Sequence, residues 1–516
     1  MFSVEDLNCF PRGWGVTPPR AAPVTSVDAA GETRRFARAG GSRRARPQTP
    51  GAMGFFDAAR RGDDGRSRRV PTSKLGTSFP LLDLPDAALA VVLKHLAAGP
   101  DGVCDIARFC LVSKPARELG LDTMRRRMRS LDLTPLGRRA RNAVPHLAAT
   151  CANLRTITCD GTNVTDACVT ALLACSERTL TRLSLADCRH LRLLHEHSHG
   201  AGARGLRELV LRGSSWSLSA LAGILRRSRK TLTSLNLSGT RLALTAGDND
   251  LRVIAARVLR CRALERLSLG SHVDVLPAAL ATVIFALLDG DERIDDDDDV
   301  DVDVNVDVDV DASSTTPTTT PDDVDDAFGL DNLKELSLAQ NGAADEKMLE
   351  IIARRCPSLT KLDLRGCTAS RDAVCAFVRN AACASSLTSL LLGGAADSLD
   401  DASLEAVASS CPSLEELDLG MHHAVGIAGM ESLRVGCVGL RRLRISRNAR
   451  VTTQSLASLV KTEGSKLELL SAVRCRRAGE PGLRSLQRDL EVAVGAGAGC
   501  RIDWVGEYSF ECDDDS

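Results

Sequence analysis

Aromatic residues are scarce in this chain: one Tyr, three Trp and eleven Phe make up 3% of its 516 residues. Leucine and alanine must therefore supply most of the packing in any hydrophobic core. The longest apolar run, from Val275 to Leu288, is interrupted by Pro277 and is too short to cross a bilayer. We therefore expect no segment that spans a membrane.

Neither sign of charge dominates, since the formal net charge is -1 at pH 7. This balance combines an arginine-rich N-terminal segment with an acidic stretch near the middle of the chain. A nucleic-acid-binding protein favours a basic stripe together with aromatic side chains on which bases can stack. The mixed charge and the lack of aromatics therefore argue against nucleic acid as a partner.

The sequence also lacks a nucleophile elbow, a phosphate-binding loop, a dinucleotide fingerprint and a zinc-protease motif. Its one histidine-rich stretch, CRHLRLLHEHSHG, holds Cys188, His190, His195, His197 and His199. Closely alternating histidines lack the paired spacing of a closed tetrahedral zinc site. We therefore expect an exposed loop here, with no metal, no cofactor and no catalytic residue, and keep an enzyme acting through this stretch as a third hypothesis.

What the chain does contain is a repeat. The frame L-x-x-L-x-L, or a close variant, begins at eleven positions, most of them 26 to 28 residues apart: Leu154, Leu180, Leu206, Leu232, Leu264, Leu333, Leu359, Leu387, Leu414, Leu440 and Leu467. A degenerate twelfth copy begins at Met128. A period in the twenties with this frame is the signature of the leucine-rich repeat, in which each unit supplies a short strand and a helix or helical turn.

Within a repeat, hydrophobic periodicity predicts a strand followed by a helix. In LTKLDLR, Leu362 and Leu364 are predicted to point inward, and Lys361, Asp363 and Arg365 outward. The following segment, EKMLEIIARRCPS, has apolar residues at helical spacing. Strand and helix are therefore expected to alternate around one continuous core.

Many of the eighteen cysteines fall in the same register. Five precede an opening leucine by three residues: Cys151, Cys261, Cys356, Cys411 and Cys437. Three follow one by eight, Cys188, Cys367 and Cys475, and at that eighth position other repeats carry Thr240, Asn341 and Asn448. Without a secretory signal, so many cysteines in a long chain indicate a reducing compartment, the cytoplasm or the nucleus. We expect buried free thiols and no disulfide framework.

These features resemble the cysteine-containing type of leucine-rich repeat, in which the motif CPSL, present here at Cys356 and Cys411, recurs. The resemblance implies an α/β solenoid over residues 128–490, a curved parallel sheet with helices on its convex side, followed by a C-terminal tail at 491–516. It also implies that the side chain at the eighth position turns inward and bonds the backbone of neighbouring turns, as Asn, Thr and Cys can partly do.

Residues 79–127, directly before the repeats, resemble an F-box. Leu84 and Pro85 form the leucine-proline opening, LAVVLKHL an amphipathic first helix, and LVSKPAR the end of a second helix. The resemblance implies a small all-α module that docks on the adaptor subunit of an SCF-type ubiquitin ligase through Leu84, Pro85, Leu89, Val92, Leu93, Leu96, Ile106, Phe109, Leu111 and Val112.

Three positions depart from the F-box pattern. Ser113 stands where Cys is usual and Ala116 where Trp is common, and Pro115 is expected to bend or end the second helix. The alternative is that residues 79–127 only cap the exposed hydrophobic end of the solenoid. Both roles can hold at once.

Two segments fall outside these modules. Residues 1–78 are rich in Arg, Gly and Pro and are expected to be disordered, with a targeting peptide or a start at Met53 as alternatives. Residues 291–327, with the run DDDDDVDVDVNVDVDVD, are expected to form a solvated acidic insertion. That run has neither the turn glycine nor the closing glutamate of a calcium loop.

The predicted sheet offers a binding surface, because residues two, four and six positions after each opening leucine need not pack in the core. We expect target binding by Lys361, Asp363, Arg365, Glu416, Asp418, Arg442 and Arg444. The F-box resemblance implies the substrate receptor of an SCF-type ubiquitin ligase, linked through the adaptor to a cullin and carrying out no catalysis itself. The alternative is a repeat scaffold unconnected with ubiquitin.

Overall fold

The structure is a computed structural model, which describes residues 93, 106, 114–191, 204–216, 218–242, 248–270, 275–290, 329–394, 399–461, 465–494 and 500–505. The chain divides into two units, Met1–Leu89 and Ala90–Ser516. The first unit and the acidic insertion 291–327 lie outside the described residues, so the expectations for those segments stay predictions.

One strand from each repeat joins a single thirteen-stranded sheet, in which every pairing is parallel. Its strands are β1 (Ser130–Asp132), β2 (Thr156–Thr158), β3 (Arg182–Ser184), β4 (Glu208–Val210), β6 (Ser234–Asn236), β8 (Arg266–Ser268), β9 (Glu335–Ser337), β10 (Lys361–Asp363), β11 (Ser389–Leu391), β12 (Glu416–Asp418), β13 (Arg442–Arg444), β14 (Leu469–Ser471) and β15 (Arg501–Asp503). A second sheet pairs β5 (Ser215–Trp216) with β7 (Arg241–Leu242).

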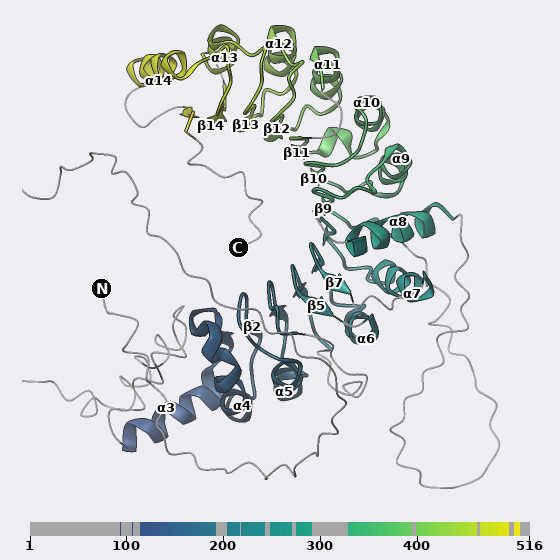
Figure 1. Ribbon diagram of the computed structural model, residues 1–516, viewed down its shortest axis with the longest axis vertical. Helices are drawn as coiled ribbons and strands as arrows, with labels where there is room; N and C mark the ends of the chain where they lie inside the picture. Colours follow the sequence, from purple (N-terminus) through teal and green to yellow (C-terminus); the bar gives the residue numbers. More distant parts are fainter. Residues whose placement is uncertain are drawn as a thin grey trace, which may run out of the picture. The chain divides into compact units, whose positions relative to one another are not determined.

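Helices connect most successive strands and lie along one side of the sheet, and no described helix lies on its other side (Figure 1). They are α3 (Lys114–Arg127), α4 (Ala140–Thr150), α5 (Asp166–Ser176), α6 (Leu218–Ser228), α7 (Asp248–Leu259), α8 (Val275–Asp289), α9 (Glu346–Arg355), α10 (Arg371–Asn380), α11 (Asp401–Ser410), α12 (Ile427–Gly436), α13 (Thr453–Val460) and α14 (Glu480–Val494), with the 3-10 helices η3 (Thr134–Arg139) and η7 (Ala384–Ser386). The predicted α/β leucine-rich-repeat solenoid is confirmed.

The core lies between sheet and helices and is built mainly from leucine. Leu362, at the centre of β10, pairs in register with Leu336 of β9 and Leu390 of β11, and is 1% exposed. Leu364 is 0% exposed, whereas Lys361 is exposed. The inward and outward residues of this strand are thus as the alternation predicted for Leu362, Leu364 and Lys361.

The sheet is continuous across the acidic insertion, as the repeat frame indicated, and extends further than that frame at its C-terminal end. β8 pairs directly with β9, Ser268 opposite Ser337, so the acidic insertion between them does not interrupt the register. Beyond residue 490, where a tail was expected, β15 adds a strand whose central Ile502 pairs with Leu470. The segment around Ile502 lacks the opening leucines of the frame, which is why the pattern did not reveal it.

Ten of the described turns hold a left-handed residue seven positions after the opening leucine, which we call the turn position. Its φ lies between 54° and 73° at Gly161, Asp187, Gly213, Gly239, Gln340, Gly366, Gly394, Met421, Arg447 and Arg474. Glycine adopts this conformation freely, whereas another L residue loses about 1 to 2 kcal/mol there. At five of these ten turn positions a residue other than glycine adopts the left-handed conformation.

The strand faces predict unequal effects of two neighbouring substitutions. Leu362→Ala should lower the free energy of unfolding by about 2 to 5 kcal/mol, because it leaves a cavity in the core. Lys361→Ala removes only an exposed ion pair with Glu335 and should cost less than about 1 kcal/mol. Chemical denaturation of both variants measures the difference, and equal losses would contradict the assigned faces.

Candidate binding face

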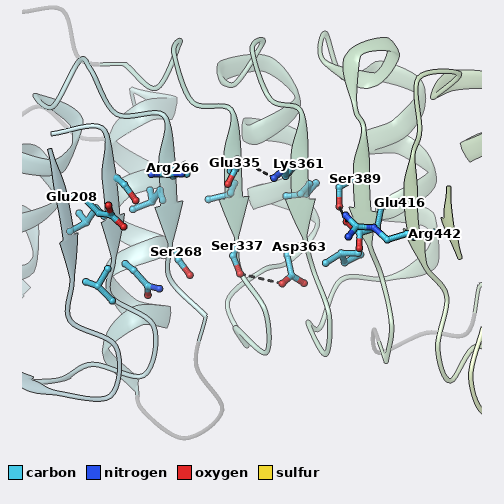
Figure 2. A pocket seen from close by; sticks show the side chains of 18 residues that line it. Glu208, Arg266, Ser268, Glu335, Ser337, Lys361, Asp363, Ser389, Glu416 and Arg442 are labelled. Carbon is cyan, nitrogen blue, oxygen red and sulfur yellow. Dashed lines mark hydrogen bonds and ion pairs between the residues drawn. The ribbon is translucent and has the colours of Figure 1, made fainter. Parts of the chain in front are cut away.

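The open side of the sheet presents two rows of side chains, from the first and third residue of each strand. We call this surface the concave face. Figure 2 shows its central part, a shallow hollow that runs from β4 to β13. The first residues of the strands form the first row and the third residues form the second row. Long charged side chains of the first row, such as Glu335 and Lys361, lie beside short side chains of the second row, such as Ser268 and Ser337. The hollow exists because the second row is short there.

Ion pairs join neighbouring strands along the first row. Lys361 Nζ lies 2.8 Å from Glu335 Oε1, and Arg442 Nη2 lies 3.1 Å from Glu416 Oε2 (Figure 2). Ser389 Oγ donates to the same Glu416 oxygen at 3.1 Å. The exposed Arg266 has no ion pair within the described part of the chain. The row therefore alternates in sign, which suits a protein partner of mixed charge.

In the second row, two carboxylates expected to face solvent are buried. Asp363 is 5% and Asp418 is 1% exposed. Asp363 accepts hydrogen bonds from Arg365 Nε at 3.0 Å and Nη2 at 2.8 Å, and Arg444 Nη1 lies 3.6 Å from Asp418 Oδ2. Burial raises the pKa of Asp418, although the Gly420 N–H and Arg444 oppose the shift. The groups left for a partner are therefore the arginines, and the aspartates orient them.

Residues eight positions after the opening leucine form a buried ladder, as the repeat resemblance implied. Six of these side chains reach the backbone carbonyl five positions after the opening residue of the preceding repeat: Cys188 to Cys159 at 3.0 Å, Thr240 to Leu211 at 3.2 Å, Asn341 to Leu269 at 3.0 Å, Cys367 to Leu338 at 2.8 Å, Asn448 to Leu419 at 3.3 Å and Cys475 to Ile445 at 3.1 Å. Thr162 differs, because it donates to the Cys159 carbonyl of its own repeat. All six are less than 5% exposed. The prediction for this position is confirmed.

The ladder has two further members that sequence reasoning missed. Ser214 Oγ donates to the Leu185 carbonyl, and His422 Nε2 lies 2.7 Å from the Leu392 carbonyl. Counting eight residues from Leu206 and Leu414 would have identified both. His422 Nδ1 accepts from the Leu399 N–H at 3.2 Å, so the ring is neutral with its proton on Nε2. Burial lowers the pKa of His422.

The cysteines of the described residues are free thiols, mostly buried. Burial raises the pKa of Cys151, Cys261, Cys356, Cys411 and Cys437 to about 12. The thiolate is the nucleophilic form, so these groups stay unreactive near neutral pH. They contribute to packing.

The predicted adaptor-binding residues are described only in part. Leu93 and Ile106 are helical and 1% and 0% exposed, and Ile106 belongs to the hydrophobic core that continues through the repeats. Leu84, Pro85, Leu89, Val92, Leu96, Phe109, Leu111 and Val112 lie outside the described residues. Pro115 lies in the first turn of α3, where its missing N–H disturbs no helical bond. Adaptor binding by this set stays a prediction.

The histidine-rich stretch also lies largely beyond what the structure describes. Cys188 is engaged in the ladder, whereas His195, His197 and His199 fall outside the described residues. Among the residues that are described, no group of three or more His, Cys, Asp or Glu is placed to hold a metal ion. In the same part of the chain, no helix has both the length and the apolarity to span a membrane.

Residues 324–486 match a family model described as FBD-associated F-box protein At5g56370, LRR repeats. The match covers less than half of the chain and confirms the F-box/leucine-rich-repeat resemblance at the level of the repeats. No curated protein matches the sequence.

Two solved structures show a weak likeness. One is the Rad7 and Elc1 complex in yeast, at 12% identity over 78% of this chain and 90% of that chain, with a TM-score of 0.39. The other is an internalin from Listeria monocytogenes, at 13% identity over 70% and 82%, with a TM-score of 0.37. With TM-scores this low, the fold assignment rests on the strand pairing of this chain itself.

Among the described ladder residues, only His422 has a side chain that titrates near neutral pH in the unfolded chain, and it predicts a pH dependence of stability. Because its pKa is lowered in the folded state, the unfolded chain takes up the proton first as pH falls below about 6.5. Stability is therefore complete above that value and is lost as pH falls toward the folded pKa. Denaturation between about pH 7.5 and about pH 5 should show a steeper loss for the wild type than for His422→Asn.

Asparagine is the matched replacement, because Asn341 and Asn448 fill the same ladder position in other repeats. Parallel pH profiles for the two proteins would show that protonation of His422 does not affect folding.

Proposed function

We propose that this chain is the substrate-recognition subunit of an SCF-type ubiquitin ligase. The observation that carries the proposal is the match of residues 324–486 to the repeats of an F-box protein. The F-box-like pattern at 79–127 supports it, because that segment directly precedes the repeat array. The chain would act in the cytoplasm, the nucleus or both.

In this proposal the segment 79–127 and the repeats bind different partners. The helical segment 79–127 docks on the adaptor subunit, and through it on a cullin. The concave face holds the target, with Arg365 and Arg444 oriented by buried carboxylates and Lys361 and Arg442 in the first row. The chain contributes proximity, because it raises the local concentration of a target lysine beside the conjugating enzyme, and no covalent step occurs on it.

A second candidate is a repeat scaffold unconnected with ubiquitin. Two observations favour it: the family match does not extend to residues 79–127, and Ile106 packs into the same core as the repeats. A segment that only capped the solenoid would bury its apolar residues in this way. Binding of the adaptor separates the two candidates.

The adaptor test uses the full chain and the purified SCF adaptor subunit. The wild type should retain the adaptor through size-exclusion chromatography, and Leu84→Ala with Pro85→Ala should weaken binding at least about tenfold, as loss of an apolar anchor does. Lys361→Glu is the control and should bind normally. Failure of the wild type to bind, or normal binding by the double variant, would leave the scaffold as the better account.

Charge reversal on the concave face should abolish target binding without affecting adaptor binding. Lys361→Glu with Arg442→Glu reverses the two charges that pair with Glu335 and Glu416. The new carboxylates repel Glu335 and Glu416, and they also repel a partner whose charges complement the first row. Proximity labelling in cells should show loss of a discrete set of neighbours while adaptor labelling persists. Arg355→Glu, on the exposed end of α9, is the matched control. Identical labelling by all three proteins would contradict target binding on this face.

A further inference from the structure

Five arginines gather in two successive turns near the C-terminal end of the sheet. We call them the arginine rim: Arg447 and Arg450 after β13, and Arg474, Arg476 and Arg477 after β14. The turns are direct neighbours, because the backbone N–H of Arg447 donates to the Val473 carbonyl at 2.8 Å. The five arginines therefore belong to two adjacent turns at the carboxyl ends of the strands.

Within the described residues, the rim carries positive charge without a counter-charge. All five side chains are exposed, and none forms an ion pair within the part of the chain that the structure describes. Arg450 Nη1 lies 3.5 Å from the Ala424 carbonyl oxygen, a contact that leaves its charge unneutralised. The carboxylate of Glu480, which follows the rim in sequence, is paired with Arg484. Arg442 on the concave face, by contrast, is paired with Glu416.

Backbone conformation gives no reason for arginine at two of these sites. Arg447 and Arg474 occupy the turn position, with φ of 62° and 60°. Five described repeats place glycine there, and the four turn positions from Gln340 to Met421 carry no charge. The turn conformation therefore does not require arginine at either position.

We infer that the arginine rim binds an acidic segment of a protein partner, whose Asp and Glu carboxylates pair with the guanidinium groups. Guanidinium and carboxylate form bidentate, charge-assisted hydrogen bonds. Neighbouring turns stand about 5 Å apart, the spacing of strands in a sheet, so a few consecutive acidic residues can reach both.

Nucleic acid fits the surface less well. A single strand binds along an extended basic groove with aromatic platforms for the bases. The rim spans only two turns and holds no aromatic side chain.

The inference deepens the target-binding half of the proposed function and does not depend on adaptor docking.

The test measures fluorescence anisotropy of a labelled peptide of alternating glutamate and serine, titrated with the full chain. The same peptide with glutamine in place of glutamate should not bind. Arg447→Gly with Arg474→Gly should weaken binding at least about tenfold, because two charge-assisted contacts are lost. This double variant should melt no lower than the wild type, since glycine suits the turn position.

Gln340→Gly is the matched control, because it makes the same backbone change at an uncharged turn position with φ of 60°. It should bind the acidic peptide as the wild type does. Equal binding of the glutamine peptide, unchanged binding by the double arginine variant, or an equal loss in Gln340→Gly would each overturn the inference. Tighter binding of a single-stranded oligonucleotide than of the peptide would also overturn it, in favour of nucleic acid. Adaptor retention by the double variant should stay normal, so failure here is distinguishable from failure of the proposed function.

Discussion

The contact on which this fold depends is a hydrogen bond from a buried side chain to a carbonyl of the preceding repeat. Where these strands end, a carbonyl points into the core and accepts a hydrogen bond from a side chain of the next repeat; the Leu211 and Leu338 carbonyls also accept a backbone N–H, from Ser214 and Asn341. A hydrogen bond of this kind contributes about 0.5 to 1.5 kcal/mol to stability. Cys367, Asn448, Thr240 and His422 each donate to such a carbonyl. The position therefore demands one donor of suitable reach, and several residue types meet that demand.

Because core and ladder occupy one side of each strand, the sheet offers side chains to a partner on the concave face and in the turns. Along that face, opposite charges pair between neighbouring strands, and the second row buries Asp363 and Asp418 beneath arginines. Such carboxylates fix the direction of a guanidinium group before a partner arrives, which lowers the entropy lost on binding. The arginine rim has no such support and is instead defined by its unneutralised charge.

The register of the repeat was enough to predict the strands of the large sheet except β15, together with their inward leucines, and the family resemblance predicted most of the ladder. Ser214 and His422 lie at the same distance from an opening leucine and follow the same rule. Burial of Asp363 could not be predicted, since alternation assigns a side chain to a face but does not say whether a neighbouring arginine covers it. The rim was missed because its five residues come together only when two turns stack.

The central claim is a division of labour, in which residues 79–127 dock on the adaptor and the repeats stay free for a target. Hydrogen exchange of the full chain, with and without the purified SCF adaptor subunit, tests it most directly. The account predicts added protection within residues 79–127 and unchanged exchange in β2 to β14. Protection on the concave face, or no protection anywhere at saturating adaptor, would contradict it.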